Sequence, residues 1–408
     1  MKKRSLVLAL VFCLLLSGCG EVLAGSYQTS SPHVDRPTTA EDSSAIRVES
    51  YRELVSAVLY LVSQGEEKGE IRFYDYPGNV EAALTEACLE VAAQDPLGAY
   101  CVDYIRHETT RVVSYDQATV SIHYRRTPEQ VRSMVKVTGT SAIRTELQEA
   151  LGAFREEVVL RVSYFSEDED SIRTLIRQAY YDTPVTAMGM PQIEINLYPD
   201  SGSQRVVEIL LTYSEPTEEL QKKSEALAQA LDELVLPSPG GPNRPTNIQT
   251  SVASEAARAL RGAAAYDQSG GSTPYAALVE GRADSEGMAL AYSLCCGKIG
   301  LSCEIVEGTF FVTPSQEDPG KPDVSADPES TSAAPGSLPR FWVSLRLSNG
   351  NTIYLDPSAE HPVTASAQDM FDAGYRWPGG PQEPEMTPET QIQAQTEDTP
   401  TDGEGESS

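Results

Sequence analysis

The sequence predicts an α+β protein in which a duplicated α-β-α-β-β module is followed by a domain with an antiparallel sheet and a buried helix. Two pairs of similar segments indicate the duplication. Glu70–Tyr74 resembles Val159–Ser163, and the same offset along the chain relates Val120–Tyr124 to Ile209–Tyr213. Strand-like segments alternate apolar and polar residues, which is typical of sheets with one covered face. A later stretch, 285–299, is small or apolar around most of its circumference, which favours a buried helix.

The two copies are predicted to share one order of elements. In the first copy we expect a helix near 49–65, a strand near 69–76, a helix near 78–94, and strands near 100–108 and 111–126. In the second we expect a helix near 140–153, a strand near 156–165, a helix near 168–181, and strands near 191–198 and 204–214. A helix start with proline follows each copy, at Thr127-Pro128-Glu129 and at Glu215-Pro216-Thr217.

Changes in composition predict the domain boundaries. Pro237–Pro242 is the clearest linker in the chain. The predicted parts are a leader at 1–18, a flexible tether at 19–47, repeats at 48–136 and 137–240 (the second with a linking helix near 216–236), a third domain at 245–380 and an acidic tail at 381–408. Residues 312–339 of the third domain are rich in Pro, Ser, Asp and Gly, which predicts a disordered insertion.

The charge balance limits the partners that the chain can have. It has 408 residues and a formal net charge of -29, and no segment forms a basic stripe. The composition therefore argues against nucleic acid as a partner. It fits a protein exposed outside a cell, although a charge total names no ligand.

The first residues predict export and lipid attachment. Lys2-Lys3-Arg4 forms a positive start, and the apolar run Leu6–Leu16 is short for a membrane span. Leu16-Ser17-Gly18-Cys19 resembles the lipobox of bacterial lipoproteins. The resemblance implies cleavage before Cys19, acylation of that cysteine, and an extracytoplasmic protein anchored to the cell membrane through lipid. A plain secretory leader is the alternative.

The other cysteines are predicted to be free, buried thiols. With Cys13 removed in the leader and Cys19 acylated, the remaining ones are Cys88, Cys101, Cys295, Cys296 and Cys303. This odd number, without C-x-x-C spacing, argues against a disulfide framework and a zinc site, although Cys88 and Cys101 could pair. The acidic run 167–170 lacks the spacing of a calcium loop and is predicted to begin a helix. We therefore predict no metal and no cofactor.

One segment of the third domain resembles a known family. The stretch 275–308 reads YAALVEGRADSEGMALAYSLCCGKIGLSCEIVEG, with a helix predicted to begin at Asp284 or Ser285. It resembles the nucleophile segment of the bacterial transglutaminase-like superfamily, whose fold is papain-like. In that family a cysteine stands at the helix N-terminus, and here Ser285 has its position. Gly300-Leu301 and a strand at Cys303–Gly308 follow at the spacing of the family.

Two further landmarks of that family are present. Arg340-Phe341-Trp342 fits its His-aromatic-Trp strand, and Asp356-Pro357 fits its Asp-Pro. A hairpin signal at Ser348–Asn351 joins the two strands. The resemblance covers roughly residues 245–380. It implies a degenerate triad of Ser285, Arg340 and Asp356, in a cleft with Tyr275, Glu286 and Trp342.

The two replacements predict an inactive centre. The chemistry of the family needs a thiolate beside an imidazole, whereas a serine hydroxyl keeps its proton unless a base removes it. Arg340 cannot be that base, because a guanidinium stays protonated at any ordinary pH. We instead expect Arg340 and Asp356 to form an ion pair. Two alternatives stay open: Cys295 or Cys296 as the nucleophile, and His361 as the base.

Three functions are compatible with these residues. The favoured hypothesis is a membrane-anchored binding or scaffold protein at the cell envelope, whose cleft holds a peptide, a cell-wall fragment or an envelope protein. The second is a transglutaminase-like hydrolase or acyltransferase that uses Ser285 with an unidentified base. The third is a structural surface protein with no specific ligand.

Overall fold

The computed structural model describes residues 45–164, 168–238, 244–311 and 336–382. These residues contain eleven α-helices, one short 3-10 helix and four sheets, so the predicted mixture of helices and sheets is confirmed. They form two compact units. The first comprises the described residues up to Met134 together with Leu197–Val206, and the second comprises the rest.

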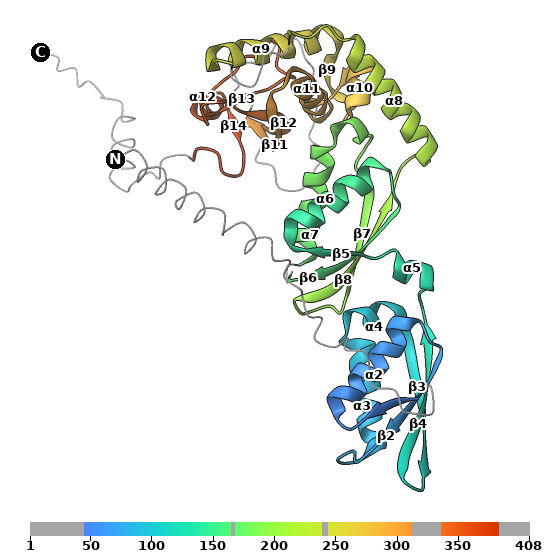
Figure 1. The fold of residues 1–408 in the computed structure, drawn as a ribbon. Helices are drawn as coiled ribbons and strands as arrows, with labels where there is room; N and C mark the ends of the chain where they lie inside the picture. The colour runs from blue at the N-terminus through green and yellow to red at the C-terminus, as the bar shows by residue number, and fades with distance from the viewer. Residues whose placement is uncertain (1–44, 165–167, 239–243, 312–335, 383–408) are drawn as a thin grey trace, which may run out of the picture. The chain divides into compact units, whose positions relative to one another are not determined.

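The first unit is built on a four-stranded sheet whose strand order is β1-β2-β4-β3 (Figure 1). Its strands are β1 (Ile46–Val48), β2 (Lys68–Phe73), β3 (Val102–Val112) and β4 (Tyr115–Tyr124). Its helices are α2 (Tyr51–Gln64), α3 (Val80–Ala93), α4 (Pro96–Cys101) and α5 (Pro128–Arg132). Helix α2 begins where the Ser50 side chain accepts a hydrogen bond from the Glu53 N–H, and it buries Leu54, Val58 and Leu61.

Two elements of this unit differ from the prediction. The segment expected to be a tether ends in β1, because Ile46 and Val48 are buried and pair in parallel with Ile71 and Phe73 of β2. Helix α4 precedes the strand that was expected from residue 100. Asp95 caps that helix, so the polypeptide completes a helical turn before it extends into β3.

The second unit contains most of another four-stranded sheet, of order β5-β6-β8-β7, whose β7–β8 turn at Leu197–Val206 belongs to the first unit. Its strands are β5 (Val135–Thr138), β6 (Glu157–Ser163), β7 (Gln192–Tyr198) and β8 (Gln204–Thr212). Its helices are α6 (Gly139–Gly152), α7 (Glu169–Asp182), the 3-10 helix η1 (Pro184–Thr186) and α8 (Thr217–Glu233). Strand β5, which pairs in parallel with β6, was not predicted. The sheet has the same pattern of strand order as the sheet of the first unit.

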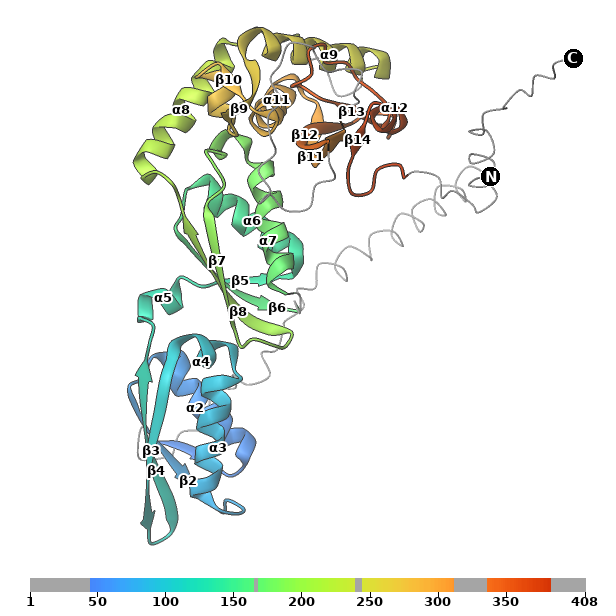
Figure 2. The ribbon, with the colours of Figure 1, turned by 180° about the vertical axis from the view of Figure 1, so that it is seen from behind.

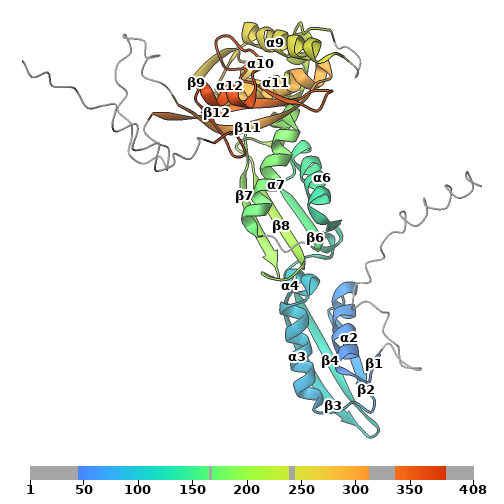
Figure 3. The same ribbon diagram turned by 90° about the vertical axis from the view of Figure 1, so that its left-hand side faces the viewer.

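The remainder of the second unit contains the predicted antiparallel sheet and buried helix. The sheet has the order β13-β12-β11-β14, and a separate two-stranded sheet pairs β10 with β9. The strands are β9 (Ala265–Gly271), β10 (Arg282–Ala283), β11 (Ser302–Phe311), β12 (Ser337–Arg346), β13 (Thr352–Leu355) and β14 (Tyr375–Arg376). The helices are α9 (Thr246–Ala263), α10 (Pro274–Leu278), α11 (Ser285–Ile299) and α12 (Ala367–Asp372). Helices α9 and α11 lie on the same side of β11 and β12 (Figures 2 and 3).

Helix α11 is held at both ends by residues suited to those positions. Asp284 accepts a hydrogen bond from the Gly287 N–H, which caps the N-terminus, and Gly300 takes the left-handed conformation that ends the helix. Gly287 also permits close packing, since a Cβ there would lie 2.7 Å from the Gly271 carbonyl oxygen. These contacts place Ser285 at the first position of the helix, directly after the cap.

Several predicted features lie outside the described residues. They are the leader with Cys19, most of the tether, residues 239–243 of the linker, most of the insertion (312–335) and most of the tail (383–408). The end of the predicted insertion differs from the prediction, because Ser337–Pro339 belong to β12 and pair with β11. No helix in the described ranges has the length and apolarity that crossing a membrane would require.

Candidate functional site

Ser285 lies against the edge of β12. Its side chain is largely buried, with 7% of the residue exposed. The Ser285 Oγ accepts a hydrogen bond of 3.2 Å from the Phe341 N–H. The hydroxyl oxygen that would have to attack a substrate is therefore already an acceptor for the backbone of the strand that carries Arg340.

Arg340 and Asp356 form the predicted ion pair. The Arg340 Nε lies 2.8 Å from Asp356 Oδ2, and the side chains are 13% and 3% exposed. The Tyr266 ring stacks under the guanidinium, with 4.5 Å between the guanidinium carbon and the ring centroid. The pair is thus nearly removed from solvent and holds β12 against the end of β13.

Asp356 has further donors that sequence reasoning missed. The Tyr375 hydroxyl donates to Asp356 Oδ2 at 2.7 Å, and the Ser358 N–H donates to Oδ1 at 2.8 Å. Ser358 could have been anticipated, since an aspartate often accepts from the backbone two residues later. Tyr375 could not, because it lies on β14, whose pairing with β11 depends on the tertiary fold.

These surroundings keep Arg340 and Tyr375 protonated. Burial is the largest single effect and lowers the pKa of Arg340, but the charge and hydrogen bond of Asp356, together with Tyr266 and Tyr375, outweigh it, and the net shift is upward. Burial and the Asp356 charge raise the pKa of Tyr375 far above its usual value. Both groups therefore keep their protons, and neither can accept the proton of Ser285.

Glu286 occupies a different environment from its neighbour. Its carboxylate accepts a hydrogen bond of 3.1 Å from the Tyr181 hydroxyl of α7. Burial raises its pKa to about 7, and the charges of Asp284 and Glu307 act in the same direction. The Tyr181 hydrogen bond and the positive charge of Arg177 oppose the shift. Glu286 is therefore a carboxyl that titrates near neutral pH.

Helix α7 borders this side of the site, which the sequence did not predict. Arg177 binds Glu307 of β11 at 2.8 Å, one helical turn before Tyr181. The Tyr181 ring also faces Phe341, with centroids 6.2 Å apart. Two side chains of α7 on the same helical face thus contact residues that surround Ser285.

Two of the predicted cleft residues lie elsewhere. Trp342 is fully buried in a cluster with Met370 and Tyr375, because successive residues of a strand point to opposite faces and Phe341 takes the face toward α11. Gly308 makes room for its ring, since a Cβ there would lie 2.4 Å from a Trp342 ring carbon. Tyr275 packs near Leu220 and Leu227 of α8 instead of beside Ser285.

The alternative nucleophiles and base lack suitable surroundings. Cys295 and Cys296 are fully buried within the core between α9, α11 and β12, and burial raises the pKa of Cys295 to about 12. His361 is an exposed residue in the bend after Ser358. In the described part of the chain, no histidine is hydrogen bonded to Ser285 or Asp356.

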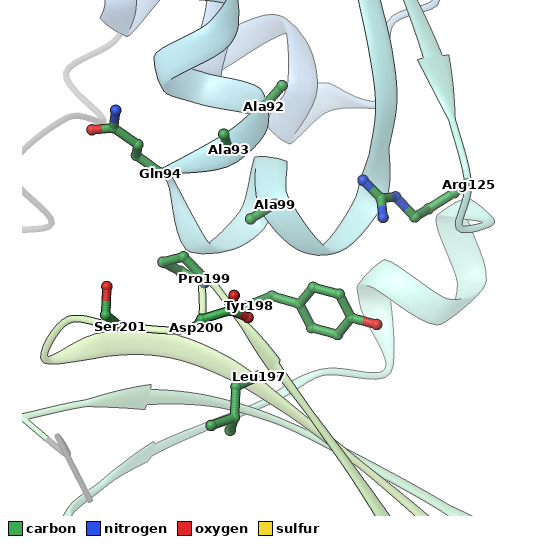
Figure 4. Close-up of a pocket in the computed structure, with 10 residues that line it drawn as sticks. All are labelled: Ala92, Ala93, Gln94, Ala99, Arg125, Leu197, Tyr198, Pro199, Asp200 and Ser201. Carbon is green, nitrogen blue, oxygen red and sulfur yellow. The ribbon is translucent and has the colours of Figure 1, made fainter. Parts of the chain in front are cut away.

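The first unit contains a separate hollow of about 750 Å³ (Figure 4). It is lined by the end of α3, by Ala99, and by the turn between β7 and β8 with Tyr198 and Pro199. Arg125 also lines it, but its Nε donates to the Val102 carbonyl at 2.8 Å. Among the described residues of both units, no three His, Cys, Asp or Glu side chains gather as metal ligands would.

Comparison with known proteins assigns no family. No protein-family model matches the sequence, and no curated protein matches it. A solved structure described as the crystal structure of a TGase is similar to part of the chain, with 9% identity and a TM-score of 0.24. The alignment covers 50% of this chain and 52% of that one, so the chain spans about half of that protein. A similarity of this size carries no argument about activity.

Proposed function

We propose that the chain is a lipid-anchored extracytoplasmic protein whose transglutaminase-like domain is catalytically inactive and serves a binding or scaffold role at the cell envelope. The observation that supports this best is the buried ion pair of Arg340 and Asp356. In a working triad, an imidazole at position 340 would pass the proton of the nucleophile and be oriented by the aspartate. Here the charge of the aspartate is neutralised by a guanidinium, which cannot take part in proton transfer because it stays protonated.

The surroundings of Ser285 support the same conclusion. An alcohol becomes a nucleophile only if a base takes its proton in the transition state. The Ser285 oxygen accepts from the Phe341 N–H, and both Arg340 and Tyr375 retain their own protons. The centre therefore stabilises the fold around the N-terminus of α11 instead of performing acyl transfer.

The contact with α7 supports a scaffold role. Tyr181 is hydrogen bonded to the Glu286 carboxylate, and Arg177 is paired with the Glu307 carboxylate. A peptide bound on this side of α11 would otherwise contact these two carboxylates. The preceding module thus acts as a built-in partner of the inactive domain. A peptide, cell-wall fragment or envelope protein would bind to the composite surface that the two modules make together.

The duplication and the anchor belong to this proposal. The equal patterns β1-β2-β4-β3 and β5-β6-β8-β7, each beginning with a parallel pair, support an origin from one repeated unit. The lipobox at Leu16–Cys19 supports anchoring. Growth of the source cells with a labelled fatty acid should place the label on the chain, and Cys19→Ala should abolish it. Equal labelling of both forms would reject the anchor.

Restoring the missing groups tests the inactive triad. In the Ser285→Cys/Arg340→His variant, the helix N-terminus and the new imidazole should lower the thiol pKa. Its alkylation by iodoacetamide at pH 6.5 should be at least about tenfold faster than in the matched control Ser285→Cys/Arg340→Gln, which has the thiol without a cationic neighbour at position 340. Equal rates in the two variants would show that positions 285 and 340 are not partners.

A hydrolase or acyltransferase is the second candidate, and Glu286 is the observation that favours it. A carboxyl with a pKa of about 7 is suited to act as a general base at neutral pH. Its carboxylate, however, accepts from Tyr181, and Ser285 is bound to the backbone of Phe341. If Glu286 were the base, hydrolysis of an activated ester would rise with pH through about 7 and disappear in both Glu286→Gln and Ser285→Ala.

A further inference from the structure

One face of the sheet in the first unit carries arginine and tyrosine side chains. Helices α2 and α3 lie on one side of β3 and β4 in Figures 1 and 2. Ile71 and Phe73 of β2 point toward these helices and are buried. Because side chains alternate along a strand, Arg72 points to the opposite face, and its register partner Arg47 of β1 does too.

Four residues on that face form a compact group, which we call the Arg–Tyr cluster: Arg47, Arg72, Tyr74 and Tyr115. The Arg47 guanidinium carbon lies 4.6 Å from the centroid of the Tyr74 ring, and that of Arg72 lies 5.2 Å from the centroid of the Tyr115 ring. The two rings lie beside each other, with centroids 5.4 Å apart. The cluster thus joins two cations and two phenols from β1, β2, β4 and the residue directly after β2.

The cluster places two like charges side by side. Arg47 and Arg72 are paired in register on neighbouring strands, where like charges destabilise a sheet. Glu49 offsets Arg47 through its Oε1, 2.5 Å from Arg47 Nη2, and the neutral Gln117 side chain accepts from Arg72 Nε at 3.1 Å. Arg47 thus has a carboxylate partner, whereas the side-chain partner of Arg72 is a neutral amide, in a chain whose net charge is -29.

We propose that the Arg–Tyr cluster binds the phosphate groups of an anionic phospholipid surface. Guanidinium forks match phosphate oxygens, and tyrosine rings are favoured at the boundary between headgroups and acyl chains. The source of the phosphate follows from the position of the cluster in the chain. Arg47 lies two residues after Ala45, where the described chain begins, and the expected lipidation residue, Cys19, lies in the preceding segment. The choice of a membrane thus rests on the proposed anchor, whereas phosphate binding does not.

The decisive experiment uses the full chain that follows the leader, with Cys19→Ala, so that no acyl group contributes. It would be sedimented with vesicles of phosphatidylglycerol and phosphatidylcholine, and with vesicles of phosphatidylcholine alone, at low and at high salt. We expect binding to the anionic vesicles at low salt, and loss of binding at high salt. Arg47→Ala and Arg72→Ala should each weaken it roughly fivefold.

Two variants separate the cluster from general charge effects. Arg132→Ala removes an exposed arginine that is paired with Glu129 outside the cluster, and it should leave vesicle binding unchanged. Glu49→Gln removes the carboxylate that competes for Arg47, and it should strengthen binding. This gain cannot result from misfolding, so it keeps the proposal testable if an arginine variant is unstable.

Three results would overturn the proposal: no binding to anionic vesicles, binding that Arg47→Ala/Arg72→Ala does not reduce, or weaker binding in Glu49→Gln. Binding of glycerol phosphate in solution without any binding to vesicles would assign the cluster to a soluble phosphate and reject the membrane surface. The Cys19→Ala protein carries no acyl group, so a failure to bind vesicles is distinct from a failure of fatty-acid labelling at Cys19.

Discussion

The charged groups on the two sides of the α11 N-terminus lie in opposite electrostatic environments. On one side, Arg340 and Asp356 neutralise each other in an almost solvent-free pair, and Tyr375 and Ser358 complete the hydrogen bonds of the carboxylate. On the other side, Glu286 lies among the like charges of Asp284 and Glu307. The first arrangement keeps Arg340 and Tyr375 protonated, whereas the second leaves one carboxyl able to titrate near pH 7.

The largest effect should come from breaking the buried pair of Arg340 and Asp356. Arg340→Ala leaves the Asp356 charge buried without its cation, and it should lower the free energy of unfolding by about 3–5 kcal/mol. Urea denaturation measures this loss. Arg282→Ala is the matched control, because its pair with Asp267 is exposed, and it should change little. Similar losses in the two variants would contradict a special role for the buried pair.

A second variant tests the hydrogen bond that the Tyr375 hydroxyl donates to Asp356. Tyr375→Phe keeps the ring packing against Trp342 and removes only the hydrogen bond to Asp356. Because that bond is buried and its acceptor is charged, the loss should be about 2 kcal/mol. The measurement is the thermal unfolding of Tyr375→Phe compared with that of the control Tyr354→Phe, whose ring packs beside Trp377. An unchanged melting temperature for Tyr375→Phe would mean that Asp356 does not depend on this donor.

Glu286 should make the stability of the protein depend on pH. Burial raises the pKa of Glu286 from 4.5 to about 7, so the folded state binds this proton more tightly than the unfolded state. Its contribution to stability is complete below pH 4.5 and is lost as the pH rises through about 7. Allowing for solvent screening, the loss should be on the order of 1–2 kcal/mol. Glu286→Gln keeps an acceptor for Tyr181 and should remove this component, whereas a variant with the wild-type pH profile would refute the assignment.

The smallest effect should come from the surface pair on α7. Both side chains of the Arg177–Glu307 pair are about half exposed, so Arg177→Ala should cost about 0.5 kcal/mol or less. It should also raise the pKa of Glu286 slightly, because Arg177 stabilises the carboxylate. Titration of Glu286 by NMR measures the shift. A fall in that pKa would place Arg177 in a different role.

The sequence predicted the parts of the site that depend on local signals. Asp284 and Gly300 are cap residues, so the limits of α11 and the place of Ser285 could be anticipated. The Arg340–Asp356 pair was expected from the two family landmarks that the resemblance places on these strands. Tyr181, Tyr375 and Tyr266 could not be found in this way, because each comes from an element whose position depends on tertiary packing. The assignment of Trp342 to the cleft was wrong, because strand register decides which side chains of β12 face α11, and the motif of Trp342 does not specify that register.

The central claim is that Ser285 has no base to activate it, and labelling with a fluorophosphonate probe tests this most directly. The chain with Cys19→Ala, its Ser285→Ala variant and an active serine hydrolase would be treated together between pH 6 and 9, and modified residues identified by mass spectrometry. We predict that Ser285 remains unmodified at every pH while the hydrolase is fully labelled. Modification of Ser285 that disappears in Ser285→Ala would contradict the account.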